Sequence, residues 1–549
     1  MKKVIISLAT VAIVFASCSD SFLTRNPAGG SLTQEQFDAL SSEKLQGTLK
    51  GLYSMIYTMS SSDHDEFGQR SIDLWGDILS CDIAVTNKTY GWLYQDEQML
   101  TVSGRTGTIW VFYYDIIHNA NTTIKSINNS SGDLMAKIAK YGYPSKATEY
   151  KYTSEETNYA LYLAQALAIR AYCYGNLVRW YTPTMESSYF AGHTIDDYPC
   201  CPVYNETNMD SPQPLSASGE VYAQIFQDLT NAINLFDEFG AYYEELNGAM
   251  FTRETKLEIN LNVARGLLAY AYLNAAPYYD KIDAAKCKNY YRAAFKHADA
   301  VIKSGEFRVI PNTMLYTTGF NSVEEPSWMW GQDVVTETAG GLKSWFGQCD
   351  IHSYSYAWAG DTKVLDDNLK TLIPLWDGRS GWFNDGSKNS KFKDCPDGKF
   401  FSAQNPNSTK EEDIDREWLS DNVFMRIESM YLIAAEACYF LDSVNVCQDY
   451  LNGITSERLN LSYPDALDEQ NAYINSLAGN KDELLKQIAY NWRIEMWGEG
   501  YGLQTFRRLT KKTKRGNNHD YSKGTEINAH DSQFNMNIPS SEATYNPNI

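Results

Sequence analysis

Two glutamates near the C-terminus have a spacing that could support hydrolysis. Glu495 and Glu499 are four residues apart, which on a helix places both carboxylates on one face, and paired carboxylates can cleave glycosidic bonds. Arginines accompany them, because Arg493 precedes the pair and Arg507 and Arg508 follow it. A neighbouring guanidinium keeps a carboxyl ionised, whereas a glycosidase needs one acid protonated near neutral pH. The spacing therefore favours buried ion pairs between helices over catalysis.

Two other segments combine aromatic rings with polar side chains in loop-like surroundings. A pyranose presents an apolar C–H face that stacks on Trp or Tyr, and loops can keep such rings exposed. The candidates are Asn87, Tyr90, Trp92 and Tyr94 in segment 82–96, and Trp345, Tyr354, Tyr356 and Trp358 in segment 340–361. The last three alternate, so an extended chain would place them on one side. We predict a ligand-binding surface here, with packing of an irregular segment as the alternative for each single ring.

Helices with small residues on one face must carry these segments. In 155–181 a narrow row of small residues would let another helix approach closely: Ala164, Ala168, Ala171 and Gly175. Similar patterns predict helices over 257–275, 286–304, 424–441 and 218–239. Thr153-x-x-Glu156 has the form of a capping box before the first of them. The sequence predicts a mainly α fold, a scaffold of tetratricopeptide-like helical hairpins.

The character of the sequence changes between 305 and 420. Helical periodicity fades there, and Gly, Asp, Asn and Ser accumulate together with seven of the 13 tryptophans. Trp328 and Trp330 lie in an apolar, strand-like setting and are predicted to be core, whereas Trp376 and Trp382 are predicted to brace a turn. We predict a large, irregular, loop-rich insertion with little β structure.

Composition excludes several classes of function. The formal net charge is −21, so phosphate backbones would be repelled and nucleic acid is not an expected partner. The seven histidines are scattered singly, without a zinc-binding spacing, and no EF-hand spacing suggests calcium. We therefore assign no metal ligands and expect no cofactor; calcium in an Asp- and Asn-rich loop stays open. The ten cysteines form no CxxC pair, and no disulfide framework is expected.

The N-terminus indicates export. Lys2 and Lys3 precede an apolar stretch, Val4 to Ala16, and small residues lead directly to Cys18. This is the form of a secretory signal, too short to span a bilayer, and its end resembles a bacterial lipobox in which the cysteine is acylated. We expect residues 1–17 to be removed and Cys18 to carry a lipid, which would be the only attachment of the protein to the membrane.

Several motifs in a fixed order resemble the SusD/RagB family. The mature start has Cys18 followed by Phe22-Leu23 and Pro27. Three segments of this chain resemble characteristic helices of the family: 164–183, Arg426-x-Glu428-x-x-Tyr-Leu-x-x-Ala-Glu436, and Arg493-x-Glu495-x-x-x-Glu499-Gly500. The chain ends on Pro539-x-x-Glu542-x-x-x-Asn546-Pro547. One departure is Gln504-Thr505-Phe506, where the family has an aromatic residue and an aspartate.

The resemblance implies a non-enzymatic, surface-facing lipoprotein of an outer membrane. Such a protein captures oligosaccharide and closes as a lid over a SusC-like TonB-dependent transporter. We expect a signal peptide at 1–17, helical parts at 18–304 and 421–549, and the ligand-binding insertion at 305–420. Two alternatives remain open: a surface glycoside hydrolase, and a helical-repeat scaffold that binds proteins and has no affinity for sugar.

Overall fold

Helices dominate the computed structural model, which describes residues 42–59, 61, 63–87, 104–247, 256–316, 320–401 and 419–549. The N-terminal signal and Cys18 lie outside these residues. The longer helices are α3 (Ser42–Tyr57), α4 (Gln69–Leu79), α6 (Gly104–Ser131), α7 (Leu134–Tyr141), α8 (Ser154–Tyr181), α9 (Ser218–Asn247), α10 (Leu261–Ala275), α11 (Ala284–Ser304), α15 (Ile427–Phe440), α16 (Val444–Thr455), α17 (Ala466–Leu477) and α18 (Lys481–Glu495). No described helix has the length and apolar character needed to cross a membrane.

Short elements connect these helices. The short α-helices are α12 (Trp345–Cys349), α13 (Tyr356–Ala359), α14 (Asp367–Lys370), α19 (Gly502–Thr505) and α20 (Ser540–Tyr545). Turns of 3-10 helix occupy Ala276–Tyr279, Asn312–Met314, Gly378–Trp382, Ser390–Phe392 and Ser532–Phe534, and a π-helical turn occupies Phe506–Thr510. Four antiparallel pairs hold the strands: β1 (Ile83–Val85) with β5 (Lys363–Leu365), β2 (Pro199–Pro202) with β3 (Leu215–Ala217), β4 (Trp328–Gln332) with β6 (Asn422–Arg426), and β7 (Lys512–Lys514) with β8 (Glu526–Asn528). The mainly α fold is confirmed.

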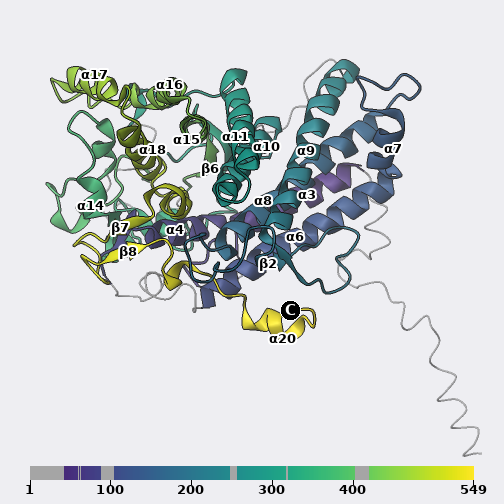
Figure 1. Ribbon diagram of the computed structural model, residues 1–549, viewed down its shortest axis with the longest axis horizontal. Coiled ribbons are helices and arrows are strands. Elements are labelled where there is room, and N and C mark those ends of the chain that lie inside the picture. Colours follow the sequence, from purple (N-terminus) through teal and green to yellow (C-terminus); the bar gives the residue numbers. More distant parts are fainter. Residues whose placement is uncertain are drawn as a thin grey trace, which may run out of the picture.

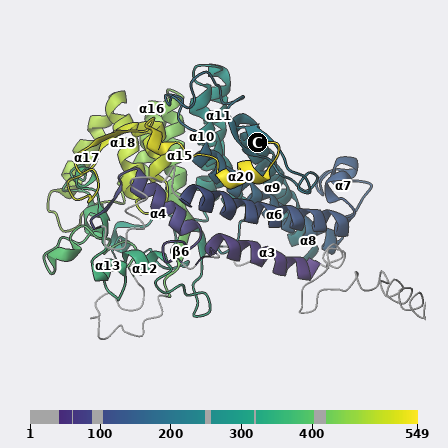
Figure 2. The same cartoon turned by 90° about the horizontal axis from the view of Figure 1, so that it is seen from below.

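Helix α8 is the centre of one side of the molecule. It packs against α6 and α9, and its row of small residues is buried, with Ala164 and Ala168 both 0% exposed. The capping box begins it: the Glu156 amide donates to Thr153 Oγ1 (3.1 Å), and the Thr153 amide donates to Glu156 Oε2 (2.9 Å). In Figures 1 and 2, α10 and α11 lie between this group and α15–α18.

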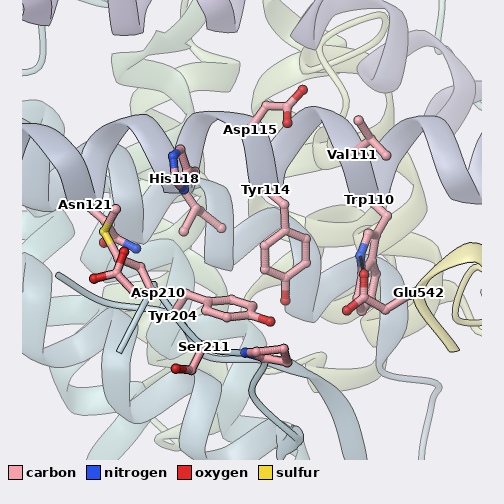
Figure 3. A pocket seen from close by; sticks show the side chains of 13 residues that line it. Trp110, Val111, Tyr114, Asp115, His118, Asn121, Tyr204, Asp210, Ser211 and Glu542 are labelled. Atoms are coloured by element: carbon pink, nitrogen blue, oxygen red, sulfur yellow. Dashed lines mark hydrogen bonds between the residues drawn. The ribbon is translucent and has the colours of Figure 1, made fainter. Parts of the chain in front are cut away.

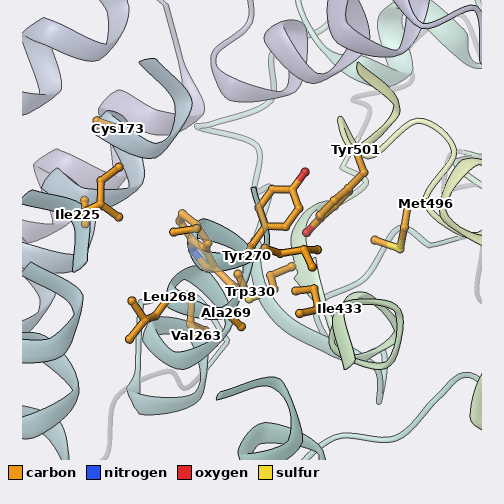
Figure 4. Packing of buried hydrophobic residues seen from close by; sticks show 14 of the residues in the cluster. Cys173, Ile225, Val263, Leu268, Ala269, Tyr270, Trp330, Ile433, Met496 and Tyr501 are labelled. Atoms are coloured by element: carbon orange, nitrogen blue, oxygen red, sulfur yellow. The ribbon is translucent and has the colours of Figure 1, made fainter. Parts of the chain in front are cut away.

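One hydrophobic core runs through all these layers. Figure 4 shows it passing from Cys173 on α8, through Tyr270 on α10 and Trp330 on β4, to Ile433 on α15. Trp328 and Trp330 are fully buried, which confirms their prediction as core residues in a strand. Since Trp382 belongs to the same cluster, the irregular region is continuous with the main core.

The predicted helix over 424–441 is wrong at its beginning. Residues 422–426 form β6, which pairs with β4, and the helix starts only at Ile427. The partner strand lies about a hundred residues earlier in the chain, so its influence is invisible in local periodicity.

Candidate functional site

The carboxylates of the helical motifs form a buried ion-pair network. Glu495 is fully buried, and its two oxygens accept from Arg426 Nη1 (2.7 Å), Arg458 Nη2 (2.7 Å), Arg458 Nε (2.8 Å) and Arg379 Nη1 (3.1 Å). Glu499 accepts from Arg426 Nε and from Lys399 Nζ (2.7 Å). The helix α18 ends at Glu495, so the two glutamates do not share a helical face as the spacing suggested. Both nevertheless meet Arg426.

This network is unsuited to acid–base catalysis. Burial alone would raise the pKa of Glu495, but Arg458, Arg426 and Arg379 outweigh it and hold the pKa well below its ordinary value. Burial would likewise raise the pKa of Glu499, but Arg426 and Lys399 outweigh it, so this pKa is lowered too. Neither carboxyl holds a proton near neutral pH, and both side chains are almost completely buried. The predicted structural role of these residues is therefore confirmed.

The pairing of β1 with β5 brings the beginning of the first aromatic segment next to the chain that follows the second. Ile83 pairs with Leu365 and Val85 with Lys363, and beyond the pair the Thr86 amide donates to the carbonyl oxygen of Thr362 (3.2 Å). Thr86, near the last described residue of the first segment, therefore lies beside Thr362, which directly follows the second segment. Asn87 follows at the surface and is exposed. Tyr90, Trp92 and Tyr94 lie outside the described residues.

Two rings of the second segment lie together at the surface. Tyr354 is 46% exposed, Trp358 is half-buried, and their ring centroids are 5.9 Å apart at an interplanar angle of 52°. Lys391 supports the tryptophan, because its Nζ donates to the Trp358 carbonyl oxygen (2.6 Å) and lies 5.4 Å from the ring centroid. We call Tyr354, Trp358 and Lys391 the aromatic platform.

The alternating residues of this segment do not form an extended chain. Ser355 caps α13 by accepting from the Trp358 amide (3.0 Å), and Tyr354, directly before the cap, lies beside Trp358 in the first turn of the helix. Tyr356 points the other way: it is 8% exposed, and its hydroxyl lies 2.7 Å from His64 Nδ1. It cannot present its face to a ligand as predicted.

Trp345 is also buried, contrary to its prediction as a binding residue. It is 1% exposed, and the Arg70 guanidinium lies 4.6 Å from its ring centroid on one side. Phe400 packs edge-on against it, with centroids 5.1 Å apart. Its position at the start of α12, next to the main core, accounts for this burial.

A second aromatic surface was missed at the sequence level. A pocket of about 480 Å³ runs along α6, with Trp110 and Tyr114 on that helix, Tyr204 opposite and Glu542 of α20 at one end (Figure 3). Asp115 lies on its rim. The i, i+4 spacing of the first two rings looks like an ordinary packed helix face. Only the tertiary structure brings Tyr204 and the C-terminal α20 to them.

The chain is thus a mainly α protein with two aromatic surfaces, one on a loop and one along a helix. The sequence model of the SusD family matches residues 358–548. A SusD-like protein of Bacteroides ovatus is 25% identical over 243 residues, which are 43% of this chain and 36% of the relative. The chain thus matches only about a third of that relative's length.

Solved structures share the fold over nearly the whole chain. A SusD-like carbohydrate binding protein from Bacteroides vulgatus aligns with a TM-score of 0.64 at 19% identity, covering 93% of this chain and 97% of the other. A SusD superfamily protein from Bacteroides thetaiotaomicron gives a TM-score of 0.66 at 18% identity, with coverages of 93% and 99%. Surface glycan-binding protein A from Bacteroides uniformis gives 0.58 at 14%, with coverages of 93% and 99%. The chain therefore has the fold of these SusD superfamily structures, and its residues 358–548 match the sequence model of the SusD family.

Proposed function

We propose that this protein binds oligosaccharide without cleaving it and passes it to a SusC-like TonB-dependent transporter. In this proposal Cys18 is acylated, and the protein faces outward from an outer membrane. Structural relatives described as a carbohydrate binding protein and a surface glycan-binding protein support the ligand class. The insertion at 305–420 would carry the binding surface, between helical parts at 18–304 and 421–549.

The aromatic platform is the observation that carries the proposal. Tyr354 and Trp358 present two tilted rings, one of them well exposed, on which the apolar face of a sugar could stack. Aromatic pairs in such arrangements contribute about 0.5–1.5 kcal/mol beyond burial, and Lys391 adds a donor for hydroxyl oxygens. We extend the proposal to Asn87, Tyr90, Trp92 and Tyr94, which follow β1 in the sequence.

A glycan-array screen followed by calorimetry tests the proposal. We expect a glycan with micromolar-to-millimolar affinity, and about tenfold weaker binding by Tyr354→Ala and by Trp358→Ala. Tyr189→Ala is the matched control, because Tyr189 is 50% exposed and lies in a different part of the surface. If both platform variants bind like the control while Asp115→Asn weakens binding, the glycan occupies the α6 pocket instead. A chain that binds no glycan on the array would refute the ligand class.

The absence of cleavage and the attachment to partners need separate measurements. Mass spectrometry of the bound glycan after prolonged incubation should recover it intact, and shortened products would favour the hydrolase alternative. Cys18→Ala should abolish incorporation of a labelled fatty acid. Co-purification of the wild type with a large β-barrel protein would support delivery to a transporter. The same co-purification without any affinity for sugar would favour the interaction scaffold.

A further inference from the structure

A small pocket away from the platform is lined mainly by cations. It lies where the end of α8 meets the segment after α19, and its charged lining residues are Arg179, Glu186, Arg507, Arg508 and Lys511. Four positive groups thus face one negative group in a protein whose formal net charge is −21. The volume is about 40 Å³, which leaves room for a small ion and not for a pyranose ring.

Arg507 is buried there without a carboxylate partner among the described residues. It is 6% exposed, and it donates only to main-chain oxygens: Nη1 to those of Arg179 and Thr182, and Nη2 to that of Phe534. Its Nε has no hydrogen-bond partner in the part of the chain that the structure describes. Burial lowers the pKa of Arg507 from its ordinary value. Burying a guanidinium without an anion costs folding free energy, so an anion bound at this position would stabilise the protein.

Three other buried arginines of this protein show how the Nε–Nη2 edge of a guanidinium can be used. In each of these three, Nε and Nη2 together bind one carboxylate, which is the strong bidentate arrangement. The pairs are Arg170 with Asp228 (2.8 and 2.7 Å), Arg458 with Glu495 (2.8 and 2.7 Å), and Arg508 with Glu436 (2.7 and 2.9 Å). Arg507 departs from this pattern because no carboxylate of the described chain reaches it.

Two further groups of the pocket have donors to offer. Arg179 is half-buried, donates to Asn176 Oδ1 (2.8 Å), and forms no ion pair within the described ranges. Thr184 is 6% exposed, and its hydroxyl has no hydrogen-bond partner. Lys511, by contrast, is already paired with Glu186 at the surface (2.8 Å). Two guanidiniums and one hydroxyl therefore line a space of the size of one anion.

We propose that this pocket binds a single tetrahedral oxyanion, phosphate or sulfate, either free or as the end group of a larger molecule. Its oxygens would accept from Arg507 Nε, the Arg179 guanidinium and the Thr184 hydroxyl, and would supply the missing negative charge. The site is separate from the aromatic platform, and it does not depend on the protein's binding of glycan.

Calorimetry and thermal unfolding at low ionic strength test the site. The probes are inorganic phosphate, inorganic sulfate and glucose 6-phosphate, each compared with chloride at equal ionic strength. We expect at least one probe to bind and to raise the Tm of the wild type. Inorganic ions that bind indicate a free anion, and binding of glucose 6-phosphate alone indicates a group carried on a larger ligand.

The variants separate binding from folding. Arg507→Ala would also remove three hydrogen bonds to main-chain oxygens, so Arg179→Gln is the main variant. We expect Arg179→Gln to weaken anion binding tenfold or more, which is about the effect of losing one charge-assisted hydrogen bond. Arg292→Gln removes the same charge from the exposed face of α11 and should bind like the wild type. The proposal is overturned if no probe differs from chloride, or if the two variants bind equally well.

Discussion

Replacing Glu495 with glutamine should destabilise the protein by about 3–5 kcal/mol, the cost of breaking a buried ion pair. Glu495 accepts four hydrogen bonds at 2.7–3.1 Å from three arginines, all of them fully buried. Glutamine keeps the shape, but its amide NH₂ would face guanidinium donors where an oxygen now accepts. Losing two charge-assisted bonds at about 1.5–3 kcal/mol each gives a loss of the same size.

Charge balance makes this position sensitive. The connected network has four cations and four carboxylates: Arg379, Lys399, Arg426 and Arg458 with Asp377, Glu428, Glu495 and Glu499. Removing one negative charge leaves one positive charge uncompensated in the interior. Unlike an exposed pair, it has no water to screen it.

The first turn of the same helix provides a matched control. Glu483 lies in α18 as well, but its pair with Lys486 is exposed (3.4 Å), so Glu483→Gln should change the free energy of unfolding by less than about 1 kcal/mol. Guanidinium unfolding followed by both fluorescence and circular dichroism measures the two variants. If Glu495→Gln costs no more than Glu483→Gln, the argument from charge balance is refuted.

Three further predictions concern stability. Burial, and after it two neighbouring cations, lowers the pKa of His297 to about 4. The unfolded chain binds this proton near pH 6.5, so the stability present above pH 6.5 is lost as the pH falls to 4. His297→Gln should remove up to about 3 kcal/mol of the loss that urea unfolding measures between pH 7 and 4. Gly500→Ala should lower the free energy of unfolding by several kcal/mol more than Gly305→Ala in the same assay. Both glycines have a positive φ (80° and 72°), so the backbone strain is similar. A Cβ at position 500 would clash with Asp73 Oδ1, whereas a Cβ at position 305 would meet no described atom within 4 Å. Equal costs would contradict that account. Thr153→Ala should lower the Tm through a loss of about 1 kcal/mol, because it breaks the capping box of α8, and an unchanged Tm would show that packing alone holds this helix end.

Local chemistry explains which elements were predictable. Helix α8 begins within one residue of the predicted position, because Thr153 and Glu156 cap it through contacts three residues apart. The beginning of α15 was missed because β6 depends on its pairing with β4, far away in the sequence. The ion-pair role of Glu495 was predictable from the arginines in its motifs, but Arg379 and Arg458 came from segments that gave no such signal.

The sequence predicted exposed rings in segment 340–361, but it did not predict which rings are exposed. Alternation suggested a strand, whereas Ser355 caps a helical turn that joins Tyr354 to Trp358 and turns Tyr356 inward. A serine before three small or aromatic residues is too weak a signal to choose between these conformations.

The pairing of β1 with β5 limits how the platform could move when it binds a ligand. Val85 and Lys363 are partners in this pair, and Lys363 is fully buried, with its Nζ 3.3 Å from Asp361 Oδ2. A shift of the second segment by one residue would turn that charged side chain to the other face of the pair, so the register is strongly specified. The chain just before Asn87 and the chain just after the platform are therefore held in one relative position. Binding at a surface anchored in this way loses less conformational entropy than binding by a loop without such an anchor.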